Sequence, residues 1–89
     1  MAKYCHSEEV FQKKIDGSVC LLKSKDRYVY KLNETASFLW ELLNKKGSRK
    51  ELSKALIKKY KIPESQAQKD VEDFLKYYLS ENLIKKVSD

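Results

Sequence analysis

The spacing of the apolar residues changes once along the chain, at Asn33, and this change limits the folds that the chain can adopt. Before Asn33 apolar and polar residues alternate, as in Val10 to Ile15, a pattern typical of a strand with one buried face. After Asn33 apolar residues recur every three or four positions, which is typical of amphipathic helices. A half made of strands followed by a half made of helices predicts an α+β fold.

The first half predicts three antiparallel strands. Asp16-Gly17 suits a type I′ turn, because both central residues of that turn need a positive φ. Ser18 to Lys23 should therefore return beside Val10 to Ile15. The polar residues Ser24-Lys25-Asp26 predict a second turn, and Arg27 to Leu32 has the aromatic and branched residues that strands favour. Two successive hairpins give a three-stranded meander.

Start and stop signals predict two helices directly after the strands. Asn33 can cap the free N–H groups of the first helix. Ser48 and Glu51 match a capping box for the second helix, which should end near Lys61. The expected inner faces are, for the first helix, Ala36, Phe38, Leu39, Trp40, Leu42 and Leu43, and for the second, Leu52, Ala55, Leu56 and Tyr60.

A third helix is predicted after Pro63, which favours an extended preceding residue and so separates two helices. Ser65 and Gln68 resemble a second capping box, and Asn82 suits the left-handed conformation that ends a helix. The expected inner face is Val71, Phe74, Leu75, Tyr78 and Leu79, after which Leu83 and Ile84 should fold back onto the core.

These elements predict one domain spanning residues 1–89, because a chain of 89 residues can build a single core. The fold class is winged-helix-like α+β, a three-stranded antiparallel sheet followed by a three-helix bundle. Residues 1–8 are expected to fray. No apolar run reaches the roughly 18 residues of a membrane span, and Met1 to Val10 lacks the apolar stretch of a signal peptide, so the expected location is the cytoplasm.

The metal-ligating and nucleophilic residue types in the sequence predict neither a metal site nor catalysis. Cys5, Cys20 and His6 give at most three soft ligands, whereas a closed zinc site uses four. Cys20 lies in an apolar run and is expected in the core; a Cys5–Cys20 bridge is conceivable, but a reducing cytosol argues against it. One histidine and two isolated glycines provide no nucleophile with a base and no phosphate-binding loop. No cofactor and no enzymatic activity are predicted.

Several segments of the chain, which together cover roughly residues 17–85, resemble the PqqD-like family. The strand-to-helix junction carries the most specific match, Tyr28-Val29-Tyr30-Lys31-Leu32-Asn33-Glu34-Thr35-Ala36 followed by Phe38-Leu39-Trp40-Glu41-Leu42-Leu43. Ser48 to Tyr60 and Asp70-Val71 through Phe74-Leu75 to Leu83-Ile84 resemble the later helices of the family. Where the family usually has Gly before Leu-Ile this chain has Asn82, which tolerates the same backbone angles.

The resemblance implies a precursor-peptide recognition element from the biosynthesis of ribosomally made, post-translationally modified peptides. Such domains bind the leader of a precursor peptide by strand addition to their third strand, beside their third helix, and present the peptide to a maturation enzyme such as a radical SAM enzyme or a leader peptidase. An edge strand offers unpaired N–H and C=O groups, so the third strand is a plausible receptor. The candidate peptide-binding residues are Tyr28, Val29, Tyr30 and Lys31 on the strand and Asp70, Asp73, Phe74 and Tyr77 on the third helix.

The net charge of +6 keeps a nucleic-acid-binding winged helix open as an alternative. Charge placement argues against it, because Glu64 to Lys76 holds two lysines against four acidic residues, a net charge of −2. Positive charge gathers from Lys45 to Lys61, with eight Lys/Arg against one Glu. This stretch fits a solvated helix face, contact with an acidic enzyme surface or contact with nucleic acid. An accessory subunit that binds no peptide, and a homodimer, also stay open.

Overall fold

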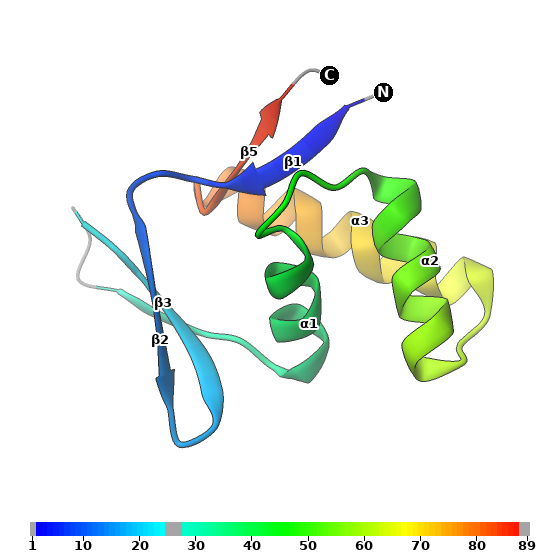
Figure 1. Ribbon diagram of the computed structural model, residues 1–89, viewed down its shortest axis with the longest axis horizontal. Helices are drawn as coiled ribbons and strands as arrows, with labels where there is room; N and C mark the ends of the chain where they lie inside the picture. Colours follow the sequence, from blue (N-terminus) through cyan, green and yellow to red (C-terminus); the bar gives the residue numbers. More distant parts are fainter. Residues whose placement is uncertain (1, 25–27, 88–89) are drawn as a thin grey trace.

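The computed structural model describes residues 2–24 and 28–87, and it contains both the strand half and the helix half (Figure 1). The elements in chain order are β1 (Lys3–His6), β2 (Val10–Ile15), β3 (Ser18–Lys23), β4 (Val29–Lys31), α1 (Glu34–Leu42), α2 (Arg49–Tyr60), α3 (Glu64–Ser80) and β5 (Ile84–Val87). β2, β3 and β4 form an antiparallel sheet in that order, and β1 pairs with β5 in a second, two-stranded sheet. The predicted α+β class and the three-stranded meander are confirmed.

The first hairpin turn has the predicted geometry. Asp16 and Gly17 have φ values of 52° and 80°, the left-handed conformation that a type I′ turn requires. Ile15 and Ser18 pair directly across the turn, which sets the register of β2 on β3. The predicted second turn and the start of the predicted third strand include residues 25–27, which lie outside the described residues. β4 begins at Val29.

From Phe11 to Ile15 β2 is exposed on both faces and only Val10 is partly buried, so the prediction of a buried face is wrong for most of this strand. Phe11 is 61% exposed and Ile15 is 45% exposed, whereas Val19 and Leu21 of β3 are buried. The reason is the position of β2 at the outer edge of the sheet, in a hairpin that extends beyond the helices (Figure 1). Alternation indicates which residues share a face of a strand, but not whether another layer covers that face.

The first two helices begin as their capping residues predict. The Asn33 side chain accepts a hydrogen bond from the Ala36 N–H at 2.8 Å. Ser48 and Glu51 form the complete capping box, in which each side chain accepts a bond from the other residue's backbone N–H. α2 ends at Tyr60, and the C-cap residue Lys61 has a left-handed φ of 55°.

The third helix differs from the prediction at its start. Pro63 occupies the N-cap position without a side-chain capping bond, and Ser65 and Gln68 lie within the helix, so the predicted capping box is wrong. Pro63 has a φ of −62°, close to the value to which its ring restricts it, and the helix begins at the next residue. At the other end Asn82 has the predicted left-handed conformation, with a φ of 58°.

The core lies where α1 meets the sheet and the other two helices. Trp40 and Leu39 of α1 are each 1% exposed, and Leu83 and Ile84 are buried as predicted. Leu42 is an exception to the expected inner face of α1, because it is 37% exposed. Cys20 is buried in β3 as predicted, and both cysteines are free thiols. None of the described helices combines the length and the apolar character needed to cross a bilayer.

β1 pairs with partners far away in the sequence, so within the segment that was expected to fray residues 3–6 form a strand. β1 pairs with β5 over four residues, and Tyr4 exchanges two backbone hydrogen bonds with Gly47. The Tyr4 side chain is 3% exposed. The His6 ring stacks on the Trp40 ring, with centroids 3.6 Å apart, and its Nε2–H donates to the Trp40 carbonyl at 2.7 Å.

We expect His6 to make the stability of the fold depend on pH. Burial lowers the pKa of the imidazole below its ordinary value of 6.5, although the bond to the Trp40 carbonyl partly offsets this. Between pH 6.5 and the lower pKa of the folded state, the unfolded chain binds more protons at His6 than the folded chain does. The contribution of His6 to the free energy of unfolding is therefore complete above pH 6.5 and falls as the pH falls toward the folded pKa.

The measurement is urea unfolding of the wild type and His6→Phe at pH 7.5 and pH 5.5. The wild type should lose more stability than the variant, since His6 is the only histidine and the carboxylates are common to both proteins. An equal loss in the two proteins would contradict this role.

Candidate peptide-binding groove

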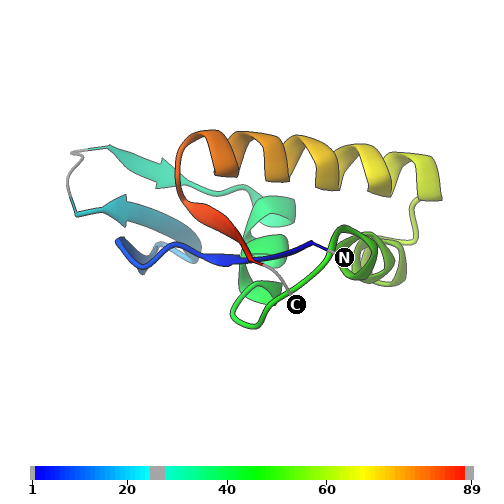
Figure 2. The same ribbon diagram turned by 90° about the horizontal axis from the view of Figure 1, so that it is seen from above.

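A groove of about 390 Å³ lies between the β4–α1 junction and α3. Figure 2 shows α3 running beside this junction along one side of the molecule. Two links to Glu81, at the end of α3, hold the sheet in place: the Tyr30 hydroxyl donates to its carboxylate at 3.0 Å, and Lys23 Nζ donates to its carbonyl at 2.6 Å. The residues that line the groove are Lys31, Leu32, Asn33, Thr35, Ala36, Leu39, Asp70, Asp73, Phe74, Tyr77 and Tyr78.

The outer edge of β4 faces away from β3. The Leu32 N–H donates to the Val19 carbonyl at 2.9 Å, and Tyr30 lies opposite Leu21, so these two residues of the β4 segment point their backbone groups toward β3. Alternate residues of a strand point their N–H and C=O groups in opposite directions, so Val29 and Lys31 point theirs away from β3. Within residues 2–24 and 28–87, β4 pairs with no strand other than β3. This edge is therefore available to an extended peptide.

Aromatic rings form the helix side of the groove. Phe74 and Tyr78 stack with centroids 4.1 Å apart, and Tyr77 meets Tyr78 edge to face at 5.5 Å. Phe74 and Tyr78 are buried and held in place by this packing, whereas Tyr77 is 51% exposed. Burial, together with the neighbouring Tyr77, raises the pKa of Tyr78 to about 12, so this ring stays uncharged at neutral pH. The wall suits apolar or aromatic side chains.

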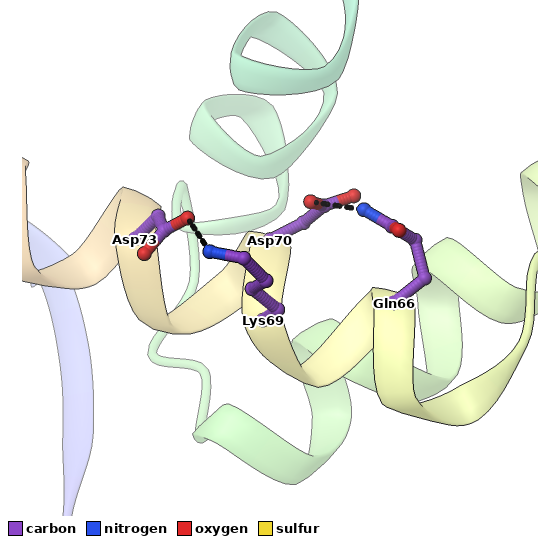
Figure 3. Close-up of polar contacts among 4 residues, drawn as sticks. All are labelled: Gln66, Lys69, Asp70 and Asp73. Carbon is purple, nitrogen blue, oxygen red and sulfur yellow. Dashed lines mark hydrogen bonds and ion pairs between the residues drawn. The ribbon is translucent and has the colours of Figure 1, made fainter.

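Two carboxylates extend the same helix face toward the start of α3 (Figure 3). Asp70 accepts a hydrogen bond from Gln66 Nε2 at 2.8 Å, and Asp73 pairs with Lys69 Nζ at 3.1 Å. Asp70 is half-buried, whereas the Lys69–Asp73 pair is exposed. The groove therefore has an aromatic part and an acidic part.

The structure brings five of the eight predicted peptide-binding residues into the groove. Lys31, Asp70, Asp73, Phe74 and Tyr77 all line it. The other three, Tyr28, Val29 and Tyr30, lie outside its lining.

Each of these three is placed differently. Tyr28 is 74% exposed just before β4, Val29 contributes its outward backbone, and Tyr30 turns inward to Glu81. Three residues of α1 also line the groove but were not among the predicted peptide-binding residues, namely Thr35, Ala36 and Leu39. The first-turn position of Thr35 and Ala36, shortly after β4, is the sequence signal that points to them.

A second cavity, of about 630 Å³, lies between α2 and α3 and shares no lining residue with the groove. Ile57 and Val71 are its apolar residues, Arg49, Lys50 and Lys54 line its α2 side, and Glu64 and Glu72 line its α3 side. The basic stretch predicted from the sequence thus lies mainly on the exposed face of α2. Within the described residues, no group of three His, Cys, Asp or Glu side chains is arranged to hold a metal ion.

The fold and the groove together define a class of protein, a winged-helix-like α+β domain with an open strand beside a helix. The family model described as coenzyme PQQ synthesis protein D (PqqD) matches residues 19–84, well over half of the chain. The chain belongs to the PqqD family, which confirms the resemblance seen in the sequence.

Two solved structures are similar over nearly the whole chain. One is described as TbiB1 in complex with the TbiA(beta) leader peptide; it has a TM-score of 0.83, is 25% identical, and the match covers 96% of this chain and 99% of that one. The other is described as lasso peptide synthetase B1 complexed with the leader peptide, with a TM-score of 0.80, 18% identity, and coverage of 92% and 96%. No curated protein matches the chain.

Proposed function

We propose that this protein binds the leader segment of a ribosomally synthesised precursor peptide, and that the leader adds a strand to the outer edge of β4. The observation that carries this proposal is the outward backbone of Val29 and Lys31 next to a groove with an aromatic wall. Membership of the PqqD family and likeness to proteins solved with leader peptides support it. The protein acts as a binding module and not as an enzyme.

Backbone pairing alone gives weak binding. Val29 and Lys31 offer one N–H and one C=O each, and every hydrogen bond made there contributes a net ~0.5–1.5 kcal/mol. Ordering a disordered peptide costs ~2–5 kcal/mol, which is as much as these bonds supply together. The affinity for the leader therefore depends on side chains that enter the groove, against Phe74, Tyr77 and the neighbouring carboxylates.

Fluorescence anisotropy tests the proposal. Labelled leaders of the precursor peptides encoded beside this gene are titrated with the protein, and one of them should bind saturably. A labelled DNA duplex is titrated in parallel at several salt concentrations. If every leader failed to bind and the duplex bound with a steep dependence on salt, the nucleic-acid alternative would replace this function.

We further propose that the protein presents the bound leader to a maturation enzyme, such as a radical SAM enzyme or a leader peptidase, through the basic face of α2. This face and the α2–α3 cavity share no residue with the groove, so an enzyme can contact them while the leader is bound. Exposed charges at the rim of an interface act mainly on the association rate.

The variant Lys50→Glu/Lys54→Glu should associate with the enzyme encoded beside this gene at least about fivefold more slowly than wild type. The matched control Lys45→Glu/Lys46→Glu has the same change in charge but lies outside the cavity lining. Leader affinity should be the same in all three proteins. Equal slowing by both variants would show a general charge effect and no specific surface.

A further inference from the structure

The two ends of the groove differ chemically, because its acidic part and its aromatic part lie at different positions along the axis of α3. Asp70 and Asp73 are one turn apart, and Tyr77 follows Asp73 by four residues. All three line the same groove, and Figure 3 shows the two carboxylates on successive turns with their partners. With a rise of ~1.5 Å per residue, Tyr77 lies ~6 Å from Asp73 and ~10 Å from Asp70 along the helix axis.

Both carboxylates can accept a further donor. Gln66 gives Asp70 one neutral hydrogen bond, and Lys69 pairs with Asp73 where both side chains are mostly exposed (72% and 66%). An exposed pair of this spacing is weak and easily exchanged. An ionised carboxylate has about four acceptor positions, so both groups keep room for a cationic side chain in the groove.

The direction of the groove relative to β4 follows from the contacts of Glu81. The Tyr30 hydroxyl reaches Glu81 at the end of α3, so β4 lies near the end of α3. The groove then continues past Leu32 and Asn33 to Thr35 and Ala36 at the start of α1. Since Asp70 precedes Tyr77 by two turns of α3, the acidic part lies toward the start of α1 and the aromatic part toward β4. The strand and the helix therefore run in opposite directions.

A leader that pairs with β4 has a preferred orientation. Every pair of neighbouring strands in this sheet is antiparallel, and antiparallel pairing is slightly the more stable kind. An antiparallel leader enters at the α1 end and leaves toward the start of β4. Its earlier residues pass Asp70 and Asp73, and its later residues pass Tyr77.

We infer that the leader recognised by this protein carries a Lys or Arg about two to three residues before an aromatic or large apolar residue, and that Asp70 and Asp73 select the basic residue. The spacing follows from a rise of ~3.3 Å per residue in a strand, which covers the 6–10 Å between the two parts of the groove in two to three residues. This inference rests on the proposed function, and it specifies which leaders the groove accepts.

Selection from a displayed library of random twelve-residue peptides tests the inference, because such a library contains basic and apolar residues in every order and spacing. Peptides that bind wild type should be enriched in Lys or Arg two to three residues before a large apolar residue. The same selection on Asp70→Asn/Asp73→Asn should retain the apolar enrichment and lose the basic one. The matched control is Glu64→Gln/Glu72→Gln, which removes two charges from the other side of α3, where both residues line the α2–α3 cavity.

One enriched peptide and its Lys→Gln (or Arg→Gln) analogue then give a quantitative check. The analogue should bind wild type at least about fivefold more weakly, and the difference should shrink below about twofold on Asp70→Asn/Asp73→Asn, because one well-placed ion pair contributes ~1 kcal/mol.

The outcomes separate this inference from the proposed function. If wild type and Val29→Pro select the same peptides, strand addition at β4 fails. Wild type could instead select apolar motifs that Val29→Pro does not select. If these motifs had no basic residue, or had it after the apolar residue, the groove would bind peptides but this inference would be overturned. An equal loss for the Lys→Gln analogue on wild type and on the double variant also overturns it.

Discussion

Replacing Val29 by proline should weaken leader binding ten- to hundredfold while the fold stays intact. Val29 points its N–H away from β3, so proline removes a hydrogen-bond donor that the domain itself does not use. The leader carbonyl opposite it would be left without a partner, which costs ~1–3 kcal/mol, and ~1.4 kcal/mol corresponds to a factor of ten. The proline ring also prevents a neighbouring strand from pairing at that position.

Two variants control for side effects of this substitution. Val29→Ala keeps the N–H and removes most of the side chain, so it should change affinity much less. Lys14→Pro places proline at an outward-facing position of β2, the opposite edge of the same sheet, which lines neither the groove nor the α2–α3 cavity. Anisotropy measures binding, and circular dichroism with thermal unfolding verifies each fold. Wild-type affinity in Val29→Pro, or an equal loss in Lys14→Pro, would contradict strand addition at β4.

Replacing Trp40 by alanine should destabilise the domain by ~3–5 kcal/mol, the usual cost of truncating a buried aromatic ring. Trp40 is 1% exposed, carries the stacked His6 ring and donates from Nε1 to Gln12 at 2.8 Å. It thereby joins β1, β2 and α1. Since the total stability of a small domain is ~5–15 kcal/mol, this substitution should remove a large share of it and lower the midpoint of thermal unfolding clearly.

Far-UV circular dichroism during urea unfolding measures this loss, because Trp40 is the only tryptophan and the variant has no tryptophan fluorescence to follow. Trp40→Phe keeps an aromatic ring and loses the bond to Gln12, so it should cost less than half as much as alanine. Glu41→Ala changes an exposed neighbour on the same helix and should be nearly neutral. A loss below ~1 kcal/mol in Trp40→Ala would show that the ring is not central to the core.

Local signals in the sequence predicted most of the fold. The turn at Asp16-Gly17, the caps at Asn33 and Ser48 and the helix stop at Asn82 each depend on a few neighbouring residues, and the structure contains all of them. The pairing of β1 with β5 was missed because it joins residues about 80 positions apart. Lys3–His6 is also too short and too mixed in polarity to predict a strand by itself.

The candidate site was predicted in part, for a related reason. Periodicity indicates that Phe74 and Tyr78 share a face of α3, but not that residues of α1 also line the groove. The exposure of β2 shows the same limit, since alternation does not reveal which face another layer covers. The resemblance to the PqqD family pointed to β4 as the proposed peptide-binding strand and to α3 as the helix beside it. The contribution of Thr35, Ala36 and Leu39 came only from the structure.

The pairing of β1 with β5 places residues 3 and 87 opposite each other, so the chain enters and leaves the domain at nearly one point (Figure 1). A unit with adjacent ends can be spliced into a surface loop of a larger protein without stretching the host. The β4 edge belongs to the other sheet, so such a graft would leave the peptide groove accessible. Together with the proposed peptide binding, this geometry would let an engineered fusion place the groove on a protein of choice.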